Sequence, residues 1–124
     1  FVARGGTIPK TNFLYRNSGN GTFDRITGAM AGESGWFSSS AWADYDNDGY
    51  LDIFVTEYQP GNNLLYRNNG DGTFSKVTAV GLVNDGGDSA GCAWADYNND
   101  GFLDLFVANY GTVQTNSLYC NQGN

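Results

Sequence analysis

The sequence repeats itself at intervals of 51 to 53 residues, and this repeat limits the choice of folds more than any other feature. The stretch "NFLYRNSGNGTFDRIT" at Asn12 returns as "NLLYRNNGDGTFSKVT" at Asn63, and "NSLYCNQGN" at Asn116 begins a third copy. Between these copies, "AWADYDNDGYLDIFV" returns as "AWADYNNDGFLDLFV", so that Trp42 and Trp94 lie 52 positions apart. Repeats of this length are supersecondary units that bury apolar surface by stacking on their neighbours.

Each repeat is predicted to contain four short strands. Val, Ile, Phe, Tyr and Thr dominate the candidate strands, as expected for half-buried pleated surfaces. The cluster "NNGDG" between the last two of them is typical of a hairpin turn. In the complete copy the strands are predicted over residues 39–43, 51–58, 63–67 and 73–78. Four antiparallel strands in a repeat of this length indicate a blade of a β-propeller, so we predict an all-β fold built of such blades.

The number of repeats is too small for a closed ring. Propellers close with typically about 4–8 blades, whereas this chain holds two full repeats and a partial one. Two alternatives remain open: the chain is part of a longer propeller, or it forms a homo-oligomer whose copies complete the ring. The chain begins at Phe1 with no visible signal peptide, and we expect a mature product or an excised piece.

Composition and charge exclude several classes of protein. The 124 residues, 40% of them hydrophobic, suit one folded domain. The formal net charge of −7 argues against nucleic acid as a partner, and no run of about 18 apolar residues is present to span a membrane. The absence of histidine removes the commonest general base. The two cysteines, Cys92 and Cys120, form either one disulfide or, as we favour, two buried free thiols.

Two short turns carry seven of the 13 acidic residues. Side-chain oxygens fall at positions 1, 3, 5 and 9 of each turn, and alternate side chains of a tight turn can converge on one point. Glycine at position 6 permits the sharp bend, and position 7 offers a backbone carbonyl. The predicted metal ligands are Asp44, Asp46, Asp48, Tyr50 and Asp52 in the first turn and Asp96, Asn98, Asp100, Phe102 and Asp104 in the second.

These ligands are all hard oxygen atoms, and they predict two Ca²⁺ sites, one in each turn. Ca²⁺ accepts about 6–8 flexible oxygen ligands, whereas Mg²⁺ demands a stricter octahedron. Zinc, copper and iron are disfavoured without nitrogen or sulfur ligands. Neither turn contains Lys or Arg, and two divalent ions would reduce the net charge from −7 to −3. With Asn98 in place of a carboxylate, the second site is expected to bind more weakly.

Two alternatives to this interpretation were weighed. An EF-hand requires glutamate at position 12, but that position is Val55 in the first turn and Val107 in the second. A turn rich in Asp, Asn and Gly can also form without any metal, because these residues favour turns. Two copies in register favour the metal site over this simpler explanation.

The two turns and the stretch "NNGDGTF" resemble the FG-GAP/VCBS repeat family, whose calcium-loop blades build the propellers of integrin α-subunits. Both turns match the D-x-D-x-D-G-x-x-D loop of that family, the second with Asn98 at position 3. The resemblance implies that the loop joins the innermost strand of a blade to the next strand. It divides one propeller segment, residues 1–124, into the last three strands of a blade with an inter-blade loop (1–38), a complete blade (39–78), and an inter-blade loop with the first three strands of another blade (79–124).

Aromatic residues outside the turns are candidates for packing or for recognition. Trp42 and Trp94 recur with the repeat, and we expect them to pack between blades. Trp36 and Phe37 do not recur as a pair and are the better candidates for an exposed contact.

Charged residues outside the turns are predicted to be structural. Arg16 and Arg67 recur in "LYRN", where the third copy has Cys120, and we expect outward-facing charges that deter edge pairing. Four further acids were considered as a glycosidase pair, but none lies in a motif: Glu33, Glu57, Asp85 and Asp88. A Ser/His/Asp triad is excluded because there is no histidine. No catalytic residue is predicted.

The function predicted from these features is that of a non-enzymatic, extracellular calcium-binding propeller module for recognition or adhesion, with a protein or a glycan as ligand. The first alternative is a carbohydrate-binding lectin. Tyr58 and Tyr110, at strand ends, either stack on a sugar or are amphipathic residues of the rim. A domain of a polysaccharide-acting enzyme is the third hypothesis.

Overall fold

The computed structural model describes residues 1, 10–28, 30, 32–58, 61–78, 81–83, 86, 88–111 and 114–123. The described chain is nearly all β, and its one helical element is a short 3₁₀ turn, η2 at Gly81–Val83. The strands of the first half are β1 (Lys10–Thr11), β2 (Leu14–Asn17), β3 (Phe23–Ile26), β4 (Ser34–Gly35), β5 (Phe37–Ala43) and β6 (Asp52–Glu57). Those of the second half are β7 (Leu64–Asn68), β8 (Phe74–Val77), β9 (Ser89–Ala95), β10 (Asp104–Asn109) and β11 (Ser117–Tyr119).

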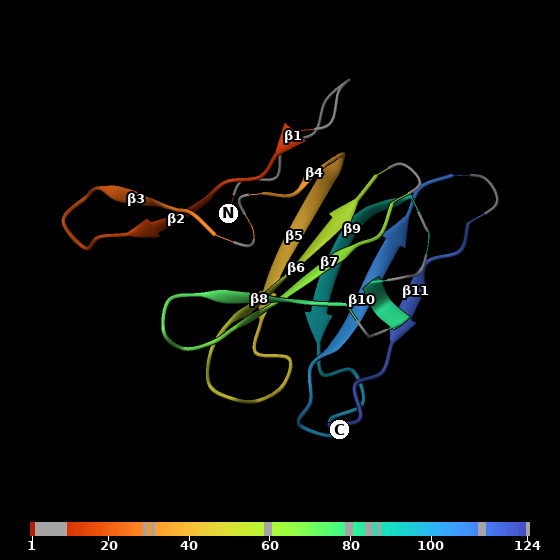
Figure 1. The fold of residues 1–124 in the computed structure, drawn as a ribbon. Coiled ribbons are helices and arrows are strands. Elements are labelled where there is room, and N and C mark those ends of the chain that lie inside the picture. The colour runs from red at the N-terminus through yellow and green to blue at the C-terminus, as the bar shows by residue number, and fades with distance from the viewer. Residues whose placement is uncertain are drawn as a thin grey trace.

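The sheets follow the order of the chain, as expected for propeller blades. The middle sheet is four-stranded and antiparallel in the order β5-β6-β7-β8, and β9, β10 and β11 form the next sheet in the same sense. Before them, β2 pairs with β3 in a hairpin, and the short strand β1 pairs with β4. Figure 1 shows the middle sheet flanked by the hairpin on one side and by the third sheet on the other. The predicted all-β blade architecture is confirmed.

Strand β6 is buried on both faces, which is why it reads as an unbroken apolar run. Side chains alternate between the two faces of a strand. Ile53 and Val55 belong to one core cluster, which includes Leu14 from the hairpin. Phe54 belongs to the other, which includes Leu105 and Val107 from the third sheet. The middle sheet is therefore the central layer of a stack.

The outer face of the third sheet is not covered by any described residue. Phe106 and Leu118 stand in the repeat where the middle sheet has Phe54 and Leu65. The middle pair is fully buried, whereas Phe106 is 43% exposed and Leu118 is 55% exposed. The same residue types change from core to surface because the middle sheet has a neighbour on that face. The sheets do not close into a ring, which fits part of a propeller.

Three sequence-based expectations are corrected by the packing. Phe37, proposed for an exposed contact, is only 2% exposed and lies in the core beside Ile53. The segment between the hairpin and the middle sheet, expected to be a loop, contains β4. Cys92 is half-buried, but Cys120 is exposed, and both cysteines are free thiols. The Asp85 candidate lies outside the described residues.

The two recurring tryptophans have different neighbours. Trp94 meets Phe54 of the middle sheet edge-on, with ring centroids 6.2 Å apart, so it packs between sheets as predicted. Trp42 meets Phe74 at the same centroid distance but is 40% exposed. It lines a groove between the β2–β3 hairpin and the middle sheet. Among the described residues no helix is long and apolar enough to cross a bilayer.

Candidate metal centre

The two acidic turns occupy equivalent places at one end of the sheets (Figure 1). The first connects β5 to β6 and the second connects β9 to β10. Asn47 of the first turn donates a hydrogen bond to the carbonyl of Gly101 in the second, at 3.2 Å. Asn121, which follows β11, donates to the carbonyl of Tyr45 in the first turn, at 2.7 Å. The turns therefore lie side by side and are tied together by amide groups.

The first turn is shaped by its own side chains. Both carboxylate oxygens of Asp44 accept backbone N–H groups, from Asp48 at 3.0 Å and from Gly49 at 2.9 Å. The chain can bend this tightly because Asn47 and Gly49 adopt positive φ angles, 57° and 91°, a conformation that Asn and Gly tolerate best. Asp48 in turn accepts the N–H of Tyr50 at 2.9 Å. The turn is pre-organised by hydrogen bonds within the protein.

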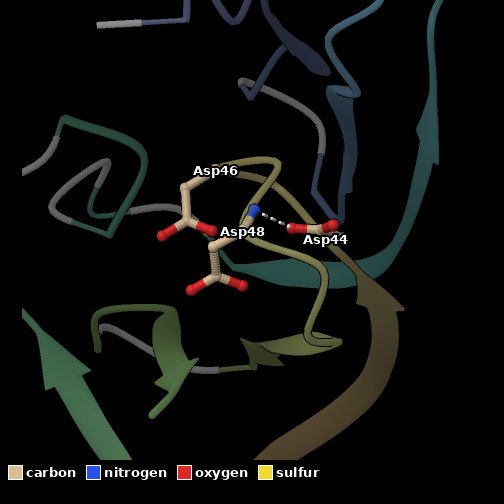
Figure 2. Close-up of side chains that lie close together, drawn as sticks. All are labelled: Asp44, Asp46 and Asp48. Atoms are coloured by element: carbon tan, nitrogen blue, oxygen red, sulfur yellow. Dashed lines mark hydrogen bonds between the residues drawn. The ribbon is translucent and has the colours of Figure 1, made fainter. Parts of the chain in front are cut away.

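Three of the predicted ligands converge in this turn. Carboxylate oxygens of Asp44, Asp46 and Asp48 all lie within 4.8 Å of one another. Two oxygens bound to one Ca²⁺ at about 2.3–2.6 Å can be no more than roughly 5 Å apart, so the spacing fits a single cation. Figure 2 shows the three side chains gathered around the turn, with the hydrogen bond from the Asp48 N–H to Asp44. The cluster could hold a metal ion, and its donor atoms are those that a hard cation prefers.

Asp52, at position 9, is buried at the base of the turn. Its two oxygens accept the N–H groups of Asn68 at 2.7 Å and of Tyr45 at 3.2 Å. Burial raises the pKa of this carboxyl from its usual 3.8, and the two backbone hydrogen bonds oppose the rise. Asp52 thereby joins the turn to the end of β7, a structural function that the sequence pattern did not reveal.

The second turn repeats this arrangement almost bond for bond. Asp96 accepts the N–H groups of Asp100 and Gly101 at 3.1 and 3.0 Å, and Asp100 accepts that of Phe102 at 2.9 Å. Asp104 accepts the N–H groups of Asn121 at 2.8 Å and of Tyr97 at 3.2 Å. Asn98 occupies the place of Asp46 and accepts the N–H of Asp100 at 3.0 Å.

The aromatic rings at position 7 have a packing role in both turns. Tyr50 and Phe102 were predicted only as carbonyl ligands. The Tyr50 ring lies over Gly70, where a Cβ would come within 2.7 Å of ring atoms. The Phe102 ring covers Gly123 in the same way. These contacts explain why the hairpin turn of each repeat needs glycine at this point, in addition to its positive φ of 75° or 69°.

Arg67 was predicted to be an outward-facing edge charge, and this prediction is wrong. From β7 it reaches the first turn, with Nε 2.5 Å from Asp46 and Nη2 2.6 Å from Asp48. The hydrogen bond to Asp46 raises the pKa of the guanidinium further above its usual 12.5. Part of the counter-charge is therefore supplied by the protein itself. The signal in the sequence was the replacement of this arginine by Cys120 in the repeat that also replaces Asp46 by Asn98.

The remaining candidate acids are separated into different contacts. Glu33 forms an ion pair with Lys76, Oε1 to Nζ 2.6 Å. The backbone N–H of Asp88 donates to Gln114 at 2.8 Å. Glu57, at the end of β6, accepts the N–H of Trp36 at 3.4 Å.

Glu57→Gln is expected to stabilise the chain at neutral pH. Burial raises the pKa of the Glu57 carboxyl above its usual 4.5, so the folded state binds its proton more tightly than the unfolded state. The stability that protonation provides is complete below pH 4.5 and is lost as the pH rises through the raised value. Glutamine keeps the acceptor oxygen for Trp36 and removes this loss. Urea denaturation between pH 4 and 8 should show a flatter pH dependence in the variant, and an unchanged slope would contradict the assignment.

The two tyrosines considered for sugar stacking lie next to each other. The rings of Tyr58 and Tyr110 pack edge-to-face with centroids 5.5 Å apart, and Tyr110 is 61% exposed. They follow β6 and β10, at the ends of these strands away from the acidic turns. The structure thus brings them together from consecutive repeats and leaves part of their surface in solvent.

Comparison with known proteins agrees with the repeat structure. The family model of the FG-GAP-like repeat matches the chain twice, over residues 1–55 and 44–107. Each match ends just after an acidic turn, within β6 or β10. No curated protein matches the chain. Because the two matches together span residues 1–107, with their acidic turns and blade strands in the expected places, the chain belongs to the FG-GAP-like repeat family.

Proposed function

We propose that this chain is a non-enzymatic, calcium-binding propeller module that acts in extracellular recognition or adhesion. The observation that carries the proposal is the convergence of three carboxylates within 4.8 Å in the first turn. The second turn has the same backbone hydrogen bonds, with Asp96 and Asp100 in the places of Asp44 and Asp48. Each turn would bind one Ca²⁺.

Calcium would stabilise the fold because each acidic turn connects two strands of one sheet. Carboxylates placed this close repel one another, and a divalent ion removes that repulsion while holding the turn closed. The first turn also contacts the second through Asn47 and Asn121. Ion binding in one turn would therefore support the packing of two neighbouring blades.

Removal of calcium is expected to lower the melting temperature of the chain. Free Ca²⁺ at 100 times the dissociation constant of a site contributes about 2.7 kcal/mol per site, which corresponds to several degrees for a domain of this size. Thermal unfolding should be compared in 1 mM Ca²⁺, in EDTA, and in EDTA with Mg²⁺ or NaCl at matched ionic strength. A melting curve that chelation leaves unchanged would refute the structural role of calcium.

An extracellular location follows from the affinity expected of such sites. Exposed loops with few charged ligands bind Ca²⁺ with dissociation constants of about 10⁻⁴–10⁻³ M in extracellular modules. Sites of that strength are filled only where calcium is abundant. The net charge of −7 and the acidic turns also disfavour a nucleic-acid partner.

A carbohydrate-binding role is the second candidate, and the paired tyrosines are the observation that favours it. Aromatic faces provide apolar surface with a polar edge, which suits contact with sugar rings. The Tyr58–Tyr110 pair lies away from the acidic turns, so it would leave the metal sites free. A glycan array in the presence of Ca²⁺ separates the two candidates, since binding to no glycan favours a protein ligand.

A further inference from the structure

Arg67 closes the mouth of the first acidic turn with two ion pairs. Its guanidinium contacts the Oδ2 atoms of Asp46 and Asp48 through two different nitrogens, at 2.5 and 2.6 Å. The planar guanidinium is well suited to hold two oxygens at once. The other oxygen of Asp48 accepts the N–H of Tyr50. Both oxygens of Asp48 therefore have a protein partner while Arg67 is in place.

The second turn satisfies the equivalent oxygen without a positive charge. Oδ2 of Asp100 accepts a hydrogen bond from Nδ2 of Asn98 at 2.8 Å. The same Nδ2 lies 3.6 Å from Sγ of Cys120, which stands in the repeat where the preceding copy has Arg67. A carboxylate and a guanidinium in the first site are thus replaced together, each by a neutral group.

These two replacements leave the formal charge of the sites equal. The first site combines four carboxylates with one guanidinium, which gives −3. The second site has three carboxylates at positions 1, 5 and 9 and a cysteine in place of the arginine, which also gives −3. Carboxylate number alone predicts tighter binding by the first turn, but the arginine cancels that advantage.

We propose that Arg67 is a built-in counter-ion of the first turn, which a divalent cation must displace from Asp46 and Asp48, and that Arg67 thereby sets the affinity of this turn. The inference rests on the proposed calcium function. The two cations compete because they use the same carboxylate oxygens and repel each other at short distance. The Arg67 side chain is 45% exposed, so it can move into solvent when the ion binds.

An NMR titration with Ca²⁺ can observe each turn separately in the same molecule. The amides of Gly49 and Gly101 donate to the first aspartate of their turns at 2.9 and 3.0 Å, and they are equivalent reporters. Arg67→Gln should lower the calcium concentration at the Gly49 midpoint about tenfold, which corresponds to about 1.4 kcal/mol. The Gly101 midpoint should not move.

Arg16→Gln is the matched control. Arg16 has the same place in the preceding repeat, but its guanidinium pairs with the exposed Asp24 at 3.5 Å. Its replacement should move neither glycine midpoint.

A transfer of the arginine to the second turn tests the inference without altering the first. Asn98→Asp alone should lower the Gly101 midpoint, because it adds a carboxylate to that site. Asn98→Asp combined with Cys120→Arg should return the midpoint close to that of the unaltered chain. This pair of variants remains decisive if Arg67→Gln does not fold.

The outcomes separate this inference from the proposed function. If both glycines respond to Ca²⁺ and Arg67→Gln leaves Gly49 unchanged or weakens its response, the inference is overturned and calcium binding stands. If Gly49 responds only after Arg67 is replaced, the inference is supported. If neither glycine responds in any variant at about 10 mM Ca²⁺, above the range of weak extracellular sites, both proposals are overturned.

Discussion

Phe54→Ala is expected to destabilise the chain by about 3–5 kcal/mol, the cost of removing a fully buried phenylalanine. Phe54 is completely buried between the middle and third sheets, in a cluster with Leu105 and Val107. Its ring also meets that of Trp94 edge-to-face. The substitution leaves a cavity at a contact between two sheets, so it weakens their packing as well as the core. Urea denaturation followed by tryptophan fluorescence measures the loss.

Phe106→Ala is the matched control for this substitution. It removes the same side chain from the same place in the next repeat, but Phe106 is 43% exposed. The expected loss is less than about 1 kcal/mol, because little apolar surface returns to water. Equal losses at the two positions would contradict an uncovered third sheet. Light scattering would then show whether a second copy covers that face.

Asp52→Ala is expected to cost about 2–5 kcal/mol even in the presence of EDTA. The Asp52 carboxylate is buried and accepts two backbone N–H groups, from Tyr45 and Asn68. Each donor left without an acceptor costs about 1–3 kcal/mol when it cannot reach water. Chelation removes any contribution of bound calcium, so the measured loss reports the structural role alone. Denaturation curves in EDTA are the measurement.

Two further substitutions make this result specific. Asp52→Asn keeps one acceptor oxygen and should lose less than Asp52→Ala. Asp46→Asn removes a carboxylate of the same turn that contacts the exposed Arg67 side chain, and it should lose least. An Asp52→Ala variant as stable as the unaltered chain in EDTA would mean that Asp52 has no structural role apart from the metal.

Local features of this protein were predictable because they depend on residues close together in the chain. The four strands of the middle sheet lie within about two residues of their predicted positions, since alternation and turn residues specify both strands and turns. The shape of the acidic turns is equally local. The hydrogen bonds from Asp44 to Asp48 and Gly49 span four and five residues, and the second turn forms the same bonds.

The sequence by itself determined the repeat, the strands, the acidic turns and the family, and tertiary structure decided which of these residues meet. Arg67 reaches Asp46 across 21 residues because β6 and β7 are paired. Phe54 is core and Phe106 is surface although their local sequences are nearly identical. Burial and ion pairing depend on which sheet lies opposite, and the local sequence of one repeat contains no information about that neighbour.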